Sequence, residues 1–174
     1  KEIKKGETLW ILPNDRALFV ATEDKVFTLQ DDLHKFSKIF DEKEVKWKGC
    51  DLKAFWKSLK LKNPSAVWDH QIAAYIVTAG DIGLFPEIYE KCFNLKLPDF
   101  PSGTELLLAN QQVEKHLREK MIAQNGLSVY ETYDLPLIQV LYSMEAHGIL
   151  LDTDILKKQS EGLHKDIRSL ETKI

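Results

Sequence analysis

Histidine and cysteine side chains are common ligands of transition metals, and their spacing in this sequence predicts no such site. The two cysteines, Cys50 and Cys92, lie far apart and form no CxxC pair, so neither a zinc site nor a disulfide framework is indicated. The eight glycines are scattered and form no phosphate-binding loop. The five histidines show neither HxH nor HxxxH spacing and predict neither a zinc site nor a hydrolase triad: His34, His70, His116, His147 and His164.

Carboxylates near the amino terminus are the next candidates, because a hard divalent cation requires clustered oxygen ligands. Four of them fall at or near predicted turns, where carboxylates are usually solvated. We therefore do not expect these side chains to form a metal site: Glu7, Asp15, Glu23 and Asp24.

A lysine-rich segment carries the strongest local positive charge. Seven lysines fall between Lys43 and Lys62 and interleave with Trp47 and Trp56. Ammonium groups can neutralise phosphates and indoles can stack on bases, but such segments more often form a solvated face with the tryptophans turned inward. Both interpretations remain open, and the candidate nucleic-acid contacts are Lys46, Lys48, Lys53 and Lys57.

The length and composition of the chain limit the kind of fold that can position these residues. The chain has 174 residues, of which 44% are hydrophobic, enough for one substantial core and an appendage. Its net charge of −3 gives no overall attraction to nucleic acid. No stretch is long and apolar enough to cross a bilayer, so we expect a cytoplasmic protein without a membrane partner. Since the chain starts at Lys1 and stops at Ile174 within an apolar repeat, we expect it to be part of a longer protein.

The first half of the sequence predicts strands followed by alternating helices and strands. Three short strands are expected between residues 8 and 29, separated by turn-forming residues, and a helix follows over 31–40. Strands near 45–47 and 66–68 flank a helix that begins after Asp51, which we interpret as its N-cap. Another helix is expected over 69–78. This order predicts an α/β fold with a mixed central sheet.

The second half predicts mainly helices, over 86–93, 105–123 and from Pro136 to Gly148. Asp152 then caps a last helix with an apolar seam that needs a partner. The partner is expected either in a following part of the chain or in the helix that starts at Pro136. The seam consists of Leu156, Leu163, Ile167, Leu170 and Ile174.

A motif in the second half carries a resemblance to a known family. The segment from Tyr133 to Ile174 resembles the junction between the exonuclease and polymerase regions of bacterial family A DNA polymerases, with the pattern E-x-P-L-x-x-V-L-x-x-M-E-x-x-G-[IV]-x-[IVL]-D. Asp134 replaces the usual glutamate. The matching residues are Pro136, Leu137, Val140, Leu141, Met144, Glu145, Gly148, Ile149 and Asp152.

Upstream segments are similar to the same family in the same order. The sequence WDHQIAAYIV, from Trp68 to Val77, resembles a family segment of the form F-D-x-x-[LI]-x-[AS]-Y-[LI]-L. The sequence VKWKGCDLKAF, from Val45 to Phe55, lies where the second exonuclease motif is expected. The resemblance implies a ribonuclease-H-like exonuclease fold over residues 1–132, and a connecting helix plus the first thumb-type helix over 133–174.

The resemblance also implies where nuclease ligands would lie. Family exonucleases bind two divalent cations about 4 Å apart, using carboxylates from three motifs. In this chain only Asp51 is a carboxylate at those positions. We therefore predict no metal in this part of the protein, and Mg²⁺ only in the polymerase site of the longer protein. The family positions fall on Leu12, Asn14, Asp51, Leu106 and Asn110, of which Leu106 replaces the water-orienting tyrosine.

Three functions follow from these observations. The first is an inactive exonuclease-like domain that supports DNA synthesis by a parent DNA-directed DNA polymerase in replication and repair, with DNA bound through that parent. The second is an active free-standing 3′-to-5′ exonuclease of the same superfamily. The third is a protein-interaction module that uses the apolar seam of the last helix.

Overall fold

The computed structural model describes residues 3–13, 18–29, 33–80 and 83–172. Its first part is an antiparallel meander of β1 (Thr8–Pro13), β2 (Leu18–Ala21) and β3 (Val26–Leu29). These strands coincide with the apolar and β-branched runs of the sequence, so the three predicted strands are confirmed.

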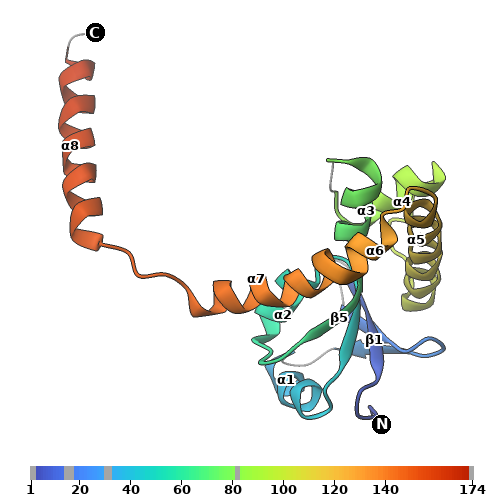
Figure 1. Cartoon of the computed structure of the whole chain (residues 1–174). Helices are drawn as coiled ribbons and strands as arrows, with labels where there is room; N and C mark the ends of the chain where they lie inside the picture. Colours follow the sequence, from blue (N-terminus) through green and yellow to red (C-terminus); the bar gives the residue numbers. More distant parts are fainter. Residues whose placement is uncertain (1–2, 14–17, 30–32, 81–82, 173–174) are drawn as a thin grey trace.

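Two further strands extend the sheet on the other side of β1. Helix α1 (Leu33–Glu42) leads into β4 (Lys46–Gly49), and α2 (Leu52–Leu59) leads into β5 (Ser65–Asp69). Strand β4 lies parallel to both β1 and β5. The described strands form a five-stranded sheet in the order β3-β2-β1-β4-β5, which confirms a mixed central sheet (Figure 1).

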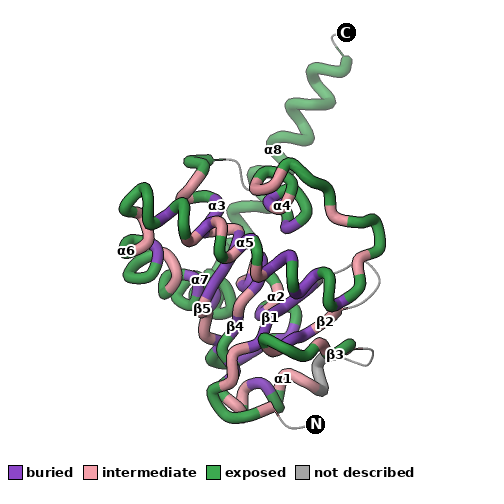
Figure 2. The backbone as a smooth tube through the Cα atoms, turned by 90° about the vertical axis from the view of Figure 1, so that its right-hand side faces the viewer, coloured by how far each residue is buried: buried purple, intermediate pink, exposed green. Residues whose placement is uncertain are grey.

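Alternating side chains of β1 separate the two faces of the sheet. Leu9 and Ile11 join the apolar cluster that contains α1, α2 and α7 (Leu135–His147), whereas Trp10 and Leu12 face α5 (Gly103–Ala123). All four side chains are nearly inaccessible to solvent. Helices therefore cover both faces of the sheet, and much of its central strands is buried (Figure 2). The sheet lies between two apolar layers.

Helix α5 lies against the sheet, and α3 (His70–Thr78) and α4 (Phe85–Phe93) pack against α5. Its start is fixed by a capping box in which Ser102 and Glu105 bond to each other's backbone. A Cβ atom added to Gly103 would lie 2.6 Å from Cγ1 of Val26, so the glycine allows α5 to start directly against β3.

The sequence did not predict the helical segment that precedes α7. A short turn, α6 (Leu127–Val129), passes through the π-helical turn η1 (Tyr130–Asp134) into α7. Pro136, in the first turn of α7, has no N–H to donate and crowds the backbone one turn earlier. The wider η1 turn lies there and relieves this crowding.

The last helix, α8 (Thr153–Glu171), stands away from the sheet (Figure 1). Its predicted cap is confirmed, because Asp152 Oδ1 accepts hydrogen bonds from the backbone N–H groups of Asp154 and Ile155. Every described residue of α8 is exposed (Figure 2). Among the described residues, the helices are all too short or too polar to span a membrane.

The fold is thus mixed α/β with helices on both faces of a five-stranded sheet, and it is compatible with a ribonuclease-H-like fold. The division at residues 132 and 133 falls inside η1 and stays a prediction. Helix α7 packs on the same side of the sheet as α2, through the buried side chains of Ile138 and Tyr142. The hydroxyl of Tyr142 donates to the carbonyl of Leu61 at 2.6 Å.

Candidate functional site

A pocket opens at the carboxyl ends of the parallel strands β1 and β4, where ligands commonly bind in open α/β sheets. It has a volume of about 580 Å³. Its walls come from the end of β1, the starts of α2, α4 and α5, and the loop that contains Leu97 and Asp99. Most of the wall is apolar, with Phe55, Phe85 and Leu106 among the larger side chains.

Asp51, at which the resemblance places a nuclease carboxylate, lines this pocket. Its backbone is left-handed, with φ 52° and ψ 55°, a conformation that aspartate tolerates better than most residues. Its Oδ1 atom accepts a hydrogen bond from the N–H of Ala54 at 3.3 Å, which confirms the predicted N-cap. Beside it, a Cβ on Gly49 would lie 3.0 Å from the carbonyl oxygen of Ile11, so glycine allows β4 to end close to β1.

Apolar packing occupies two other positions at which the resemblance places nuclease ligands, those of Leu12 and Leu106. Leu12 and Leu106 belong to one buried cluster on the α5 face of β1, with 0% and 4% of their surfaces exposed. Leu106 also contributes to the pocket wall. Asn14 lies outside the described residues. The structure therefore brings Leu12, Leu106 and Asp51 to the same end of the sheet, with one carboxylate among the three.

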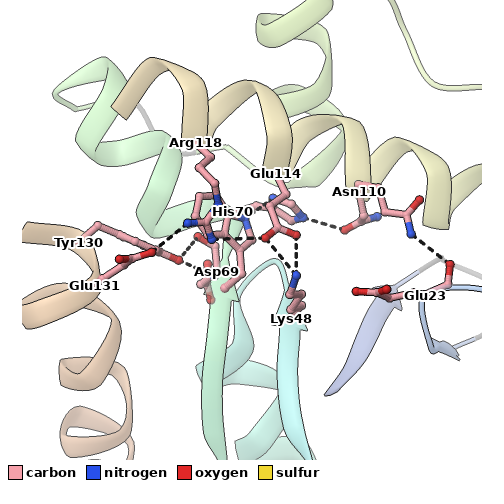
Figure 3. Close-up of polar contacts among 11 residues, drawn as sticks. Glu23, Lys48, Asp69, His70, Asn110, Glu114, Arg118, Tyr130 and Glu131 are labelled. Carbon is pink, nitrogen blue, oxygen red and sulfur yellow. Dashed lines mark hydrogen bonds and ion pairs between the residues drawn. The ribbon is translucent and has the colours of Figure 1, made fainter. Parts of the chain in front are cut away.

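Asn110, the remaining family position, is buried and hydrogen-bonded one turn along α5 from Leu106 (Figure 3). Its Nδ2 donates to the carbonyl of Leu106 at 2.8 Å, and its Oδ1 lies 3.1 Å from Nε2 of His70. The other imidazole nitrogen, Nδ1, accepts from Nε1 of Trp68 at 3.0 Å. Because Nδ1 must accept, His70 is neutral and donates from Nε2 to Asn110.

The burial of His70 accounts for its charge state. Complete burial and, to a lesser extent, the positive charge of Lys48 lower the pKa of His70 to about 3, despite the hydrogen bond to Asn110. The neighbouring Asp69 is also buried, and burial raises its pKa to about 6. Three backbone N–H groups oppose that rise, those of Leu52, Gln71 and Ile72.

A chain of charged residues lies between β4 and α5 (Figure 3). Lys48 Nζ lies 2.9 and 3.0 Å from the two carboxylate oxygens of Glu114, and both side chains are largely buried. The ammonium also lies 5.0 Å from the ring centroid of Trp10. Arg118 continues the chain, bonding Glu114 at 3.5 Å and Glu131 at 2.9 Å. These contacts attach α5 to the sheet and to η1.

The candidate DNA-binding lysines do not form one surface. Lys48 points toward α5, whereas Lys53 and Lys57 lie 2.6 and 3.7 Å from the carboxylate oxygens of Glu145 in α7. Lys46 is exposed at the opposite end of β4 from the pocket. DNA contact by these lysines stays a prediction.

The tryptophans of the lysine-rich segment turn inward, as one of the two interpretations expected. Trp47 and Trp56 are 1% and 0% exposed. Stacking of these indoles on bases is therefore excluded in this conformation.

Metal-binding side chains do not gather in threes anywhere in the described ranges, counting histidine, cysteine, aspartate and glutamate. The pocket can therefore offer apolar contact and carboxylate charge. The sequence analysis missed the structural role of His70, because a single histidine without a spaced partner predicts neither a metal site nor a catalytic site. The alternation of Trp68 and His70 around the cap Asp69 was the available clue.

Comparison with known proteins supports a relationship for most of the chain. No protein-family model matches the sequence. The chain is 27% identical, over 191 aligned positions, to DNA polymerase I of Bacillus subtilis (strain 168). The chain is similar to a bacterial DNA polymerase I. The alignment covers 95% of this chain but only 20% of that protein, so the chain spans about a fifth of the length of this relative. The similarity supports a DNA polymerase I-related protein.

Proposed function

We propose that this chain is a 3′-to-5′ exonuclease-like domain of a DNA polymerase I that has lost its nuclease metal site, followed by the first helix of the polymerase region. The observation that carries the proposal is the burial of Leu12 and Leu106 in one apolar cluster at the end of β1. A two-cation mechanism needs clustered oxygen ligands there. The similarity to a DNA polymerase I and the mixed sheet support the same proposal.

The proposed role is structural support for template-directed synthesis by a longer protein. In α7, the family-matching residues Leu137, Val140 and Met144 are 46%, 52% and 63% exposed. The residues that attach α7 to the sheet, Ile138 and Tyr142, occupy variable positions of the motif. The apolar residues of the motif therefore form a surface that faces away from this domain. We propose that it and the α8 seam contact the polymerase region of the same chain.

The biological consequence concerns proofreading. A polymerase with this domain removes no mismatched 3′ nucleotide through it, so the proposed parent acts in repair or in short gap filling during replication, in the cytoplasm. Mg²⁺ is required in the polymerase site of the parent and not in this domain.

The decisive experiment is a nuclease assay. The purified chain is incubated with a labelled single-stranded oligonucleotide in Mg²⁺ and then in Mn²⁺, beside the variant Asp51→Asn, which keeps the helix cap but removes the charge. A known exonuclease verifies the substrate. We expect no shortening of the 3′ end by either protein. Shortening by the wild type that Asp51→Asn abolishes would overturn the proposal and favour an active free-standing exonuclease.

A further inference from the structure

The described lining residues give the pocket at the end of β1 a negative charge, which would repel the phosphates of nucleic acid. Its lining includes Asp51 and Asp99 and, among the described residues that form its wall, no lysine, arginine or histidine. Grooves that bind single strands combine positive charge with exposed aromatic faces. A phosphate in this pocket would face two carboxylates, and the described lining residues supply no cation to compensate them.

The carboxylates of the pocket are available to a ligand. Asp51 uses Oδ1 for the N–H of Ala54, and in the described part of the chain neither Asp51 nor Asp99 forms an ion pair. Asp99 is exposed at the mouth of the pocket, and Asp51 is partly exposed. Among the described residues, a cation that entered would therefore displace no ion-pair partner of either carboxylate.

The size and apolar character of the pocket suggest what accompanies that cation. A volume of about 580 Å³ lies within the range of about 300 to 1,000 Å³ that holds small ligands or a few side chains. Leu84 lines the pocket and is 64% exposed, which gives the mouth an apolar edge. Phe55, Phe85 and Leu97 continue the apolar wall inside.

We propose that this pocket binds a basic side chain flanked by apolar side chains in a segment of a partner protein, with the ammonium or guanidinium group paired to Asp51 and Asp99. The presence of two carboxylates and a mainly apolar wall in the lining of one pocket carries the proposal. It concerns the ligand of the pocket and does not depend on the relation to DNA polymerases.

The test uses small probes that share an apolar body and differ in charge. The ¹⁵N-labelled chain is titrated with 4-phenylbutylammonium, 4-phenylbutanol, 4-phenylbutyrate and tetrathymidylate, and amide chemical shifts are followed by NMR. We expect the ammonium to shift the amides of Cys50, Ala54 and Leu106 and to bind about fivefold more tightly than the alcohol. The butyrate and the tetrathymidylate should leave these amides unchanged.

Variants test whether the preference for the ammonium over the alcohol arises in the pocket. Asp51→Asn keeps the cap and the left-handed backbone, and Asp99→Asn changes an exposed loop residue, so both variants should fold. Each should weaken ammonium binding about twofold, and the double variant should bind the ammonium no more tightly than the alcohol, whereas the control Asp166→Asn on α8 should change neither affinity. Equal binding of ammonium and alcohol by the wild type, no shift at the pocket amides, or binding of tetrathymidylate there would each overturn the proposal. Because no cleavage is measured, this result is independent of the nuclease assay.

Discussion

The indole Nε1 of Trp68 lies 3.0 Å from Nδ1 of His70 and fixes the buried imidazole as the neutral form protonated at Nε2. Asn110 completes the arrangement by accepting from Nε2. Asn110, at which the resemblance places a nuclease carboxylate, therefore serves as a hydrogen-bond partner that attaches α5 to the end of β5.

Because His70 is neutral in the folded protein, we expect the free energy of unfolding to decrease in acid. Its pKa falls from 6.5 to about 3 on folding, so between these pH values the unfolded chain binds a proton that the folded chain does not. Its contribution is present above pH 6.5 and is lost as the pH falls toward 3. Relative to His70→Gln, the wild type should lose about 1.4 kcal/mol of unfolding free energy per pH unit in this range. Urea unfolding at several pH values measures the difference; parallel curves would contradict it.

Asp69 should change the free energy of unfolding with pH in the direction opposite to that of His70. Burial raises its pKa from 3.8 to about 6, so the folded chain binds a proton in this interval that the unfolded chain does not. Its contribution is fully present below pH 3.8 and is lost as the pH rises through 6. Relative to Asp69→Asn, the wild type should gain stability as the pH falls from 6 to 4, by about 1.4 kcal/mol per unit. In the wild type the slopes of Asp69 and His70 largely cancel over this interval. A wild type that shows the same pH slope as Asp69→Asn would contradict this assignment.

Replacing Asn110 by aspartate should favour the charged form of His70. In Asn110→Asp, a carboxylate would lie about 3 Å from Nε2 and stabilise the imidazolium, which should raise the pKa of His70 above its value of about 3 in the wild type. The variant also loses the donor to the carbonyl of Leu106, so it should be less stable. NMR titration of the His70 ring protons measures the pKa, with Asn110→Ser as the uncharged control. An unchanged pKa would show that the two side chains do not interact as described.

Local signals predicted much of the fold, and long-range packing accounts for what they missed. Asp51 and Asp152 were recognised as caps because a cap acts on the next three residues. The role of Lys48 was not predictable in this way, because its partner Glu114 lies 66 residues later in the chain. The same holds for Tyr130, whose hydroxyl accepts from the N–H of Asp69 at 2.8 Å. The burial of Leu12 against the α5 face likewise required the tertiary structure.

Replacement of Glu114 and replacement of Lys48 should lower the free energy of unfolding by different amounts. Glu114→Gln leaves a largely buried ammonium with no carboxylate partner, whereas Lys48→Met leaves Glu114 still bonded to Arg118. We expect Glu114→Gln to cost about 2 to 3 kcal/mol and Lys48→Met about 1 kcal/mol. Urea unfolding of both variants and of the double variant measures the difference. Equal costs for the two single variants would mean that Arg118 does not support Glu114 in solution.

Removal of α8 should leave the stability of the remaining protein almost unchanged. Every described residue of α8 is exposed, so its apolar side chains contribute no burial within this chain. A chain that ends at Gly148 should melt within about 2 °C of the full chain, because surface changes usually cost under about 0.5 kcal/mol. By contrast, Ile138→Ala in α7 should cost about 2 to 4 kcal/mol, since Ile138 is 5% exposed and packs in the core. Calorimetry of the three proteins separates the helices: a large loss on removal of α8 would mean that its seam packs on this domain, and a small loss at Ile138 would mean that α7 does not.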